Sequence, residues 1–229
     1  MSIEKNIIEV KEKIDKALIK SGRAGDEVQL IAVTKTVDIH RINEAIAAGI
    51  TSIGENRTNE LEEKYNVLGN KVDFHMIGHL QTNKVKNIIG KAKLIHSLDR
   101  ISLAKELDKR SKRNNIITDV LIQVNVAEEE SKFGLRVNDV LYFIEDILEF
   151  TNIRIRGLMT IAPYTDDKAL LRNVFRSLYK LREDIKGRKY EGVSMDYLSM
   201  GMSNDFELAI EEGSNMVRIG SSIFGKRNY

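Results

Sequence analysis

The sequence lacks several features on which other proteins of its size depend. Its 229 residues include no cysteine, and Pro163 is the single proline. Without cysteine neither disulfides nor thiolate chemistry are available, so the fold must rest on its hydrophobic core. No stretch approaches the ~18 uninterrupted apolar residues of a membrane span, and the first residues, MSIEKNIIEV, lack the apolar segment of a signal peptide. We therefore expect a cytoplasmic protein.

A strong excess of either charge is also absent. The chain has 36 basic and 34 acidic residues, which gives a net charge of +2. Hydrophobic residues make up 42% and charged residues 31%, as in an ordinary soluble globular protein. The balance argues against nucleic acid or a membrane as the main partner.

Strand-like and helical segments alternate along the chain. An amphipathic segment comes first, with Ile3, Ile7, Ile14 and Leu18 on one helical face and Gly22 as a stop. Eight β-type segments follow, and each precedes a helical segment. They read VQLIAVT, TSIG, VDFHMIG, KLIHS, DVLIQVNV, IRIRGLMT, DYLSM and NMVRIG. Nearly continuous apolar runs such as the first are typical of parallel strands buried on both faces.

This alternation predicts an α/β fold. Eight strand–helix units after one extra N-terminal helix indicate a single (β/α)8 TIM barrel, and an open doubly wound sheet is the alternative. No linker, low-complexity segment or break in composition divides the chain. We therefore expect one domain over residues 1–229.

Polar and small residues collect where the predicted strands end, which is where barrels carry their chemistry. They are Lys35, residues 54–56, Gly78, His79, Asn125, Met159, Thr160, residues 199–203 and residues 218–222. Only Glu55 adds a carboxylate, so chemistry by a pair of carboxylates is not favoured.

The last two segments of this set resemble phosphate-binding loops. SMGMSND supplies Ser203 at the start of one helix, and RIGSS supplies the backbone N–H groups of Gly220 and Ser221 at the start of another. Helix N-termini with glycine and serine bind phosphate, and barrels often hold a phosphate in the loops after strands seven and eight. The alternative is that these serines only cap their helices.

Lys35 closes the first strand between two threonines. A lysine whose pKa is lowered by burial or by a neighbouring cation readily forms a Schiff base. The first and eighth strands are neighbours in a closed barrel, so we expect Lys35 and Arg218 to lie side by side. A phosphorylated aldehyde could then bridge the lysine and the phosphate loops. The alternative is a lysine that simply reaches solvent.

Metal and nucleotide sites have little support. His75 and His79 lie ~13 Å apart if both are on one strand, and no HExxH motif is present. The glycines form neither a GxGxxG nor a P-loop pattern. We expect no metal.

Several long motifs resemble those of the pyridoxal phosphate homeostasis protein family. They are LIAVTKT, SIGEN, FHMIGHLQTNK, HSLDR, LIQVNVAEEESKFG, IRGLMTIAP, LSMGMSNDFELAI and GSNMVRIGSSIFG. The resemblance covers almost the whole chain in order. It implies an alanine-racemase-like barrel of the fold-type III class, with pyridoxal 5'-phosphate (PLP) as cofactor.

The resemblance also implies which residues bind PLP, and it implies no catalytic residue. Lys35 would form the Schiff base, and Arg218 would face the pyridine nitrogen. The implied cofactor-binding residues are Lys35, Asn56, Met200, Ser203, Arg218, Gly220 and Ser221. Of these, Ser203, Gly220 and Ser221 would hold the phosphate, and Asn56 and Met200 would lie near the ring.

Arg218 argues against strong catalysis, because a guanidinium leaves the ring nitrogen unprotonated and a carbanion poorly stabilised. Racemases of this class also use a second domain, and we expect none here because the chain ends at Tyr229. We therefore expect a monomeric PLP-binding protein with little or no turnover. It would act in intracellular vitamin B6 homeostasis and amino-acid balance, with apo PLP-dependent enzymes as recipients.

Three other functions remain open on the sequence alone. The first is a weak PLP-dependent amino-acid racemase or lyase. A Schiff-base aldolase without cofactor would share the lysine and the phosphate loops, but it gives Arg218 no evident purpose. A pure interaction protein is the least favoured, because the polar residues converge on one face.

Overall fold

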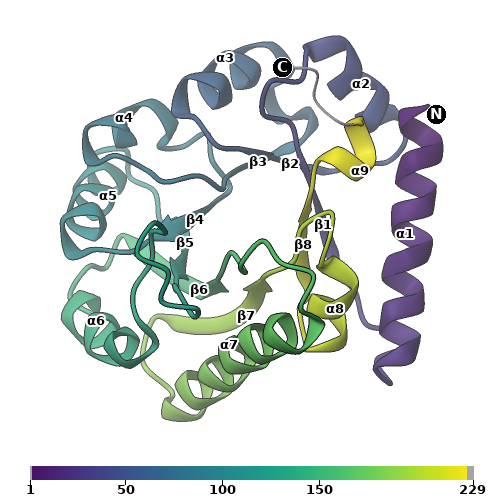
Figure 1. The fold of residues 1–229 in the computed structure, drawn as a ribbon. Coiled ribbons are helices and arrows are strands. Elements are labelled where there is room, and N and C mark those ends of the chain that lie inside the picture. Colours follow the sequence, from purple (N-terminus) through teal and green to yellow (C-terminus); the bar gives the residue numbers. More distant parts are fainter. Residues whose placement is uncertain (1, 226–229) are drawn as a thin grey trace.

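Eight parallel strands close into a barrel in the computed structural model, which describes residues 2–225 (Figure 1). The strands are β1 (Gln29–Val33), β2 (Ser52–Glu55), β3 (Asp73–Met76), β4 (Leu94–Leu98), β5 (Thr118–Gln123), β6 (Ile153–Met159), β7 (Val193–Ser199) and β8 (Met216–Ile219). They follow the chain order around the ring, and β8 pairs with β1. The predicted (β/α)8 barrel is confirmed, and the open doubly wound sheet is excluded.

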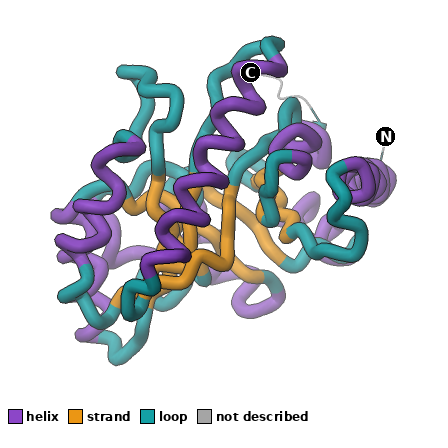
Figure 2. Tube along the Cα trace, turned by 90° about the horizontal axis from the view of Figure 1, so that it is seen from below, coloured by secondary structure: helices purple, strands orange, loops and turns teal. Residues whose placement is uncertain are grey.

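Helices surround the barrel, as Figures 1 and 2 show in two perpendicular views. The α-helices are α1 (Ile3–Lys20), α2 (Ile39–Ala47), α3 (Thr58–Leu68), α4 (Val85–Ile88), α5 (Ile101–Arg113), α6 (Val140–Ile147), α7 (Lys168–Arg188), α8 (Phe206–Glu211) and α9 (Ser221–Phe224). The 3₁₀ helices are η1 (Gly69–Lys71), η2 (Thr82–Lys84) and η3 (Val137–Asp139). Within residues 2–225, every helix is too short or too polar to cross a bilayer.

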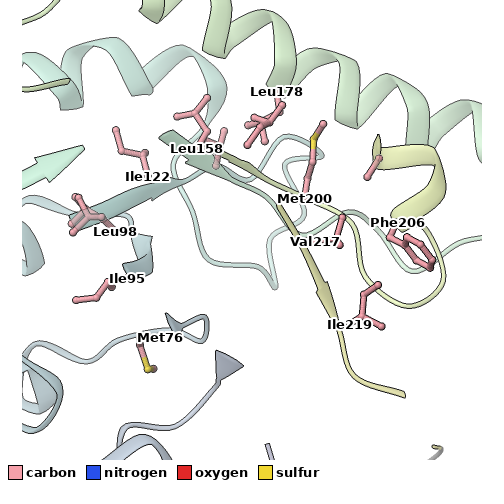
Figure 3. Packing of buried hydrophobic residues seen from close by; sticks show 14 of the residues in the cluster. Met76, Ile95, Leu98, Ile122, Leu158, Leu178, Met200, Phe206, Val217 and Ile219 are labelled. Carbon is pink, nitrogen blue, oxygen red and sulfur yellow. The ribbon is translucent and has the colours of Figure 1, made fainter. Parts of the chain in front are cut away.

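The strands bury apolar side chains on both faces. One cluster fills the space between the barrel and the helices, and Figure 3 shows part of it, including Leu178 of α7 and Met200. A second, smaller cluster consists of Ile31, Leu94, Leu121, Met159 and Met216. Because successive residues of a strand point to opposite faces, this second set marks the lumen side of the barrel.

The extra helix α1 braces the last two units of the barrel. It packs along α8 and α9, and its buried face includes the predicted Ile3, Ile7 and Ile14 (Figure 1). Asn6 donates from Nδ2 to the Ile223 carbonyl at 2.8 Å. The helix therefore supports α9 and the loop that leads into it.

Gly157 allows β6 and β7 to approach closely. Its φ is +149°, and a Cβ atom there would lie 1.9 Å from the Tyr197 carbonyl oxygen. The strand pairing shifts register at this point. As a result Thr160 continues beyond β6 and donates its N–H to the Ser199 carbonyl at the end of β7.

Candidate functional site

Lys35 lies at the rim of the barrel, in a tight turn after β1. The Val37 N–H donates to the Thr34 carbonyl at 2.9 Å, and Thr36 has a φ of +62°. These are the features of a type II turn with Lys35 at its second position. The alternation along β1, with Ile31 in the lumen cluster, places half-buried Lys35 on the lumen side.

Arg218 is a buried cation in the wall of the lumen. Its side chain is only 3% exposed, and its Nη1 donates to the carbonyl oxygen and to Oγ of Ser199 at 2.8 and 2.6 Å. Nη2 donates to the Thr160 carbonyl at 2.8 Å. These acceptors are neutral, and they take three of the five N–H groups of a guanidinium.

No ion pair involving Arg218 is found among residues 2–225, although Asp205 lies close enough to favour its charged form. Burial lowers the pKa of Arg218 to about 10, so it stays protonated at neutral pH. Burying a charge without a partner is costly unless something else satisfies it. A ligand in the lumen would find this cation ready to donate.

Lys35 and Arg218 do not lie side by side as we expected. In the pairing of β1 with β8, Arg218 is opposite Ile31, four residues before Lys35. Four residues correspond to ~13 Å along a strand, so Arg218 starts deeper in the barrel than Lys35. The stagger between neighbouring strands is set when the barrel closes, so neighbouring strands need not end at the same depth.

The loops after β7 and β8 meet at Ser203. Its Oγ accepts hydrogen bonds from the N–H groups of Gly220 and Ser222, at 3.3 and 3.4 Å. Ser203 therefore does not cap α8, contrary to our alternative, because α8 begins only after Asp205. Two backbone donors from one loop converge on a hydroxyl from the other.

The chain after β8 packs closely on β1 at Gly220. A Cβ atom on Gly220 would lie 3.3 Å from Val33 Cβ and 3.4 Å from the Val33 carbonyl oxygen. The loop after β8 thus passes directly over the end of β1. The predicted Ser221 is the next residue, where α9 begins, and it is exposed.

Asn56 and Met200 occupy different environments. Asn56 follows β2, and its Oδ1 is buried without a hydrogen-bond partner among the described residues. Met200 is fully buried, and its side chain packs in the cluster between the barrel and the helices (Figure 3). Any contact between Met200 and a ligand in the lumen would have to come from its backbone.

A chain of polar side chains crosses the lumen beneath the rim. His75 Nδ1 lies 3.0 Å from His96 Nε2, and His96 Nδ1 lies 3.1 Å from Ser199 Oγ, which accepts from Arg218. Burial, with a smaller effect of Lys93, lowers the pKa of His75 to about 3. Burial, then the charges of His75 and Arg218, lower the pKa of His96 well below its usual value. Both rings are therefore neutral at physiological pH.

His79 lies apart from this chain. Its ring stacks on that of Phe133, with 3.8 Å between centroids, and its Nδ1 is 3.7 Å from Asp99 Oδ2. No group of metal-ligating side chains is found in residues 2–225.

The model of the alanine racemase N-terminal domain family matches residues 12–228. A protein from Aquifex aeolicus named pyridoxal phosphate homeostasis protein is 46% identical over 221 residues, which is 96% of each chain. The chain belongs to the pyridoxal phosphate homeostasis protein family.

Solved structures agree with this assignment. A protein of unknown function from Bifidobacterium adolescentis superposes with a TM-score of 0.93 at 36% identity, covering 97% of this chain and 94% of the other. PipY from Synechococcus elongatus, solved with PLP bound, gives a TM-score of 0.80 at 30% identity, covering 93% and 100%. The resemblance that the motifs indicated is therefore confirmed over the full chain.

Some residues of the site were given no role from the sequence. Ser222 is the second serine of RIGSS, but nothing in that motif shows which of the two serines faces the neighbouring loop. His96 and Ser199 stand in motifs that carried the family resemblance, yet their contact joins strands 103 residues apart. Periodicity along one strand carries no signal for such contacts across the lumen.

Proposed function

We propose that this protein binds PLP as a Schiff base on Lys35 and acts in intracellular vitamin B6 homeostasis and amino-acid balance, with little or no turnover. The observation that carries the proposal is the convergence at one barrel mouth of a lysine, a set of backbone N–H donors and a buried arginine. PipY, a relative at 30% identity, has been solved with PLP bound, which supports the same ligand here.

The loops at Ser203 suit the phosphate of PLP. The N–H groups of Gly220 and Ser222 converge on the Ser203 hydroxyl at 3.3 and 3.4 Å, so a phosphate oxygen arriving there would meet donors that are already oriented. Ser221, the exposed first residue of α9, can add its N–H and hydroxyl.

Lys35 is placed to supply the covalent link. When bound, PLP supplies an aldehyde that an amine can capture and a ring that can accept electrons from a substrate. Lys35 lies at the rim, one strand away from the loops that would hold the phosphate. Asn56 follows β2, and its Oδ1, which has no hydrogen-bond partner within residues 2–225, would provide a polar contact for the ring.

Arg218 would limit the chemistry. Its three bonds to Ser199 and Thr160 hold the guanidinium in the lumen wall, and its remaining N–H groups can only donate. A donor at the pyridine nitrogen keeps that nitrogen unprotonated, which makes the ring a poor electron sink. The site is therefore better suited to holding and releasing PLP than to racemisation.

Apo PLP-dependent enzymes are the recipients we propose, and the protein would act in the cytoplasm as a monomer. Transfer needs a link that can be reversed, and a Schiff base is exchanged by any competing amine. Light scattering of the purified protein tests the monomeric state, and the activity that an apoenzyme gains when mixed with PLP-loaded protein tests the delivery.

Absorption spectroscopy tests the covalent site. Wild-type protein titrated with PLP should gain the visible band of a Schiff base, and Lys35→Ala should not. Lys93→Ala is a matched control, since Lys93 precedes β4 at the opposite end of the barrel. Borohydride reduction followed by peptide mapping should then place the modified lysine at position 35. A band that persists in Lys35→Ala would remove Lys35 from the mechanism.

The alanine racemase fold of the family makes a weak PLP-dependent racemase or lyase the alternative. Loaded protein incubated with single-enantiomer amino acids, with chiral chromatography as the readout, separates the two functions. Turnover that is lost in Lys35→Ala would favour the enzyme over the carrier.

A further inference from the structure

The turn that carries Lys35 is strained. Thr36 has a φ of +62°, in the left-handed region that a β-branched residue rarely adopts. Position three of a type II turn usually holds glycine or asparagine for this reason. Such strain persists only where the surroundings hold it in place, and it concentrates at functional sites.

Two side chains of α3 hydrogen-bond to the backbone on either side of Lys35, and we call this pair of contacts the grip. Glu60 Oε2 accepts from the N–H of Thr36 at 2.8 Å. Lys64 Nζ donates to the carbonyl of Thr34 at 2.7 Å. Glu60 and Lys64 are four residues apart, so they lie on the same helix face, and their charged atoms are 3.5 Å from each other.

This grip is anchored in the wall of the barrel. Lys64 Nζ also donates to Glu55 Oε1 at 2.7 Å, and the Thr34 hydroxyl donates to the same oxygen at 2.5 Å. Glu55 belongs to β2 and is fully buried. The pair Lys64–Glu55 therefore joins α3 to the barrel, and the turn cannot move without breaking buried, charged hydrogen bonds.

We propose that Glu60 and Lys64 are positioning residues that hold the strained turn so that Lys35 points at its target. The inference rests on the proposed function of Lys35. Each acts through the backbone next to the lysine. Holding the turn in advance lowers the ordering cost of forming the covalent link, so the grip should favour PLP capture rather than phosphate binding.

Glu60→Ala tests the grip with two ligands. PLP can bond to Lys35, whereas pyridoxine 5'-phosphate has an alcohol in place of the aldehyde and reports phosphate and ring binding alone. We expect Glu60→Ala to weaken PLP binding about tenfold, as for one charge-assisted hydrogen bond, and to leave pyridoxine 5'-phosphate binding unchanged. Equal weakening of both ligands, or of neither, would overturn the proposal.

Control variants distinguish the positioning effect of Glu60 from a general effect of removing a glutamate from α3. Glu62→Ala removes a neighbouring glutamate that pairs with Lys91 at 2.5 Å and does not touch the turn, so PLP binding should persist. Glu60→Gln keeps an oxygen acceptor and should recover part of the PLP binding that Glu60→Ala loses. Thr36→Asn in the Glu60→Ala background should also recover binding, because asparagine tolerates a positive φ. A double variant no better than Glu60→Ala would contradict the role of strain.

A readout without PLP keeps this inference separate from the proposed function. In the ligand-free protein, the exposed Thr36 N–H should exchange slowly with solvent because Glu60 holds it, and Glu60→Ala should speed that exchange. Unchanged exchange would refute the grip even if PLP binds. Wild-type protein that shows slow exchange but no Schiff base would instead refute the proposed function of Lys35.

Discussion

Lowering the pH should destabilise this protein through its two buried histidines. In the unfolded chain a histidine has a pKa near 6.5. In the folded protein burial lowers the pKa of His75 to about 3 and that of His96 well below its usual value. A base whose pKa is lower when folded binds fewer protons in the folded state. The free energy of unfolding is therefore highest above pH 6.5 and falls as the pH decreases below it.

The size of the effect follows from the difference in bound protons. Each pH unit below 6.5 costs about 1.4 kcal/mol for a histidine that stays neutral in the fold. At pH 5.0, 1.5 units lower, His75 alone should remove about 2 kcal/mol of the free energy of unfolding measured at pH 7.5. His96 acts in the same direction, because burial lowers its pKa as well. A loss of this size is a large share of the stability of an ordinary domain.

Urea denaturation of the ligand-free protein at pH 7.5, 6.5, 5.5 and 5.0 measures this dependence. His75→Asn keeps an acceptor near the place of Nδ1 and removes one titrating group, so its loss between pH 7.5 and 5.0 should be smaller by about 2 kcal/mol. Burial raises the pKa values of Glu55 and Asp205, which acts in the opposite direction, but both carboxylates are present in both proteins. The exposed histidine His40 supplies the control His40→Asn, which should follow the wild type. Parallel curves for wild type and His75→Asn would refute the reasoning.

Three further changes test individual contacts. Met200→Ala should lower the free energy of unfolding by about 2–4 kcal/mol in chemical denaturation without weakening PLP binding, because the side chain packs outside the lumen. Nitrogen NMR should find the ring proton of both His75 and His96 on Nε2. Arg218 can only donate to Ser199, so the Ser199 hydroxyl donates to His96 Nδ1, and His96 Nε2 donates to His75 Nδ1. A proton on His96 Nδ1 would contradict this direction. Arg218→Glu, in protein that keeps its circular dichroism, should shift the absorption band of bound PLP, and an identical spectrum would count against contact with the ring.

The order of the strands and helices, and the residues at the rim of the barrel, could be predicted from the sequence. Apolar runs such as VQLIAVT and the helical periodicity of Ile3, Ile7 and Ile14 depend on residues that are close in the chain. Counting eight such units therefore predicted the barrel. Once the barrel was assumed, strand ends placed Lys35 and Arg218 together at its mouth, which is wrong for the depth of Arg218.

Side-chain direction was harder to predict. Met200 stands in the same motif as Ser199 and Gly201, but neighbouring residues of an extended chain face opposite sides. The Ser199 side chain therefore contacts Arg218 in the lumen, whereas the Met200 side chain packs in the outer core. The motif resemblance covers both positions and does not show which of them faces the lumen.

By itself the sequence determined the succession of strands and helices, the family and the chemical groups available at the barrel mouth. Only the tertiary structure decided the depth of Arg218 relative to Lys35, the chain from His75 to Arg218, and the hold of α3 on the turn at Thr36. The physical reason is that local periodicity is encoded in contiguous residues. Strand stagger and contacts across the lumen arise only when eight strands close into one ring.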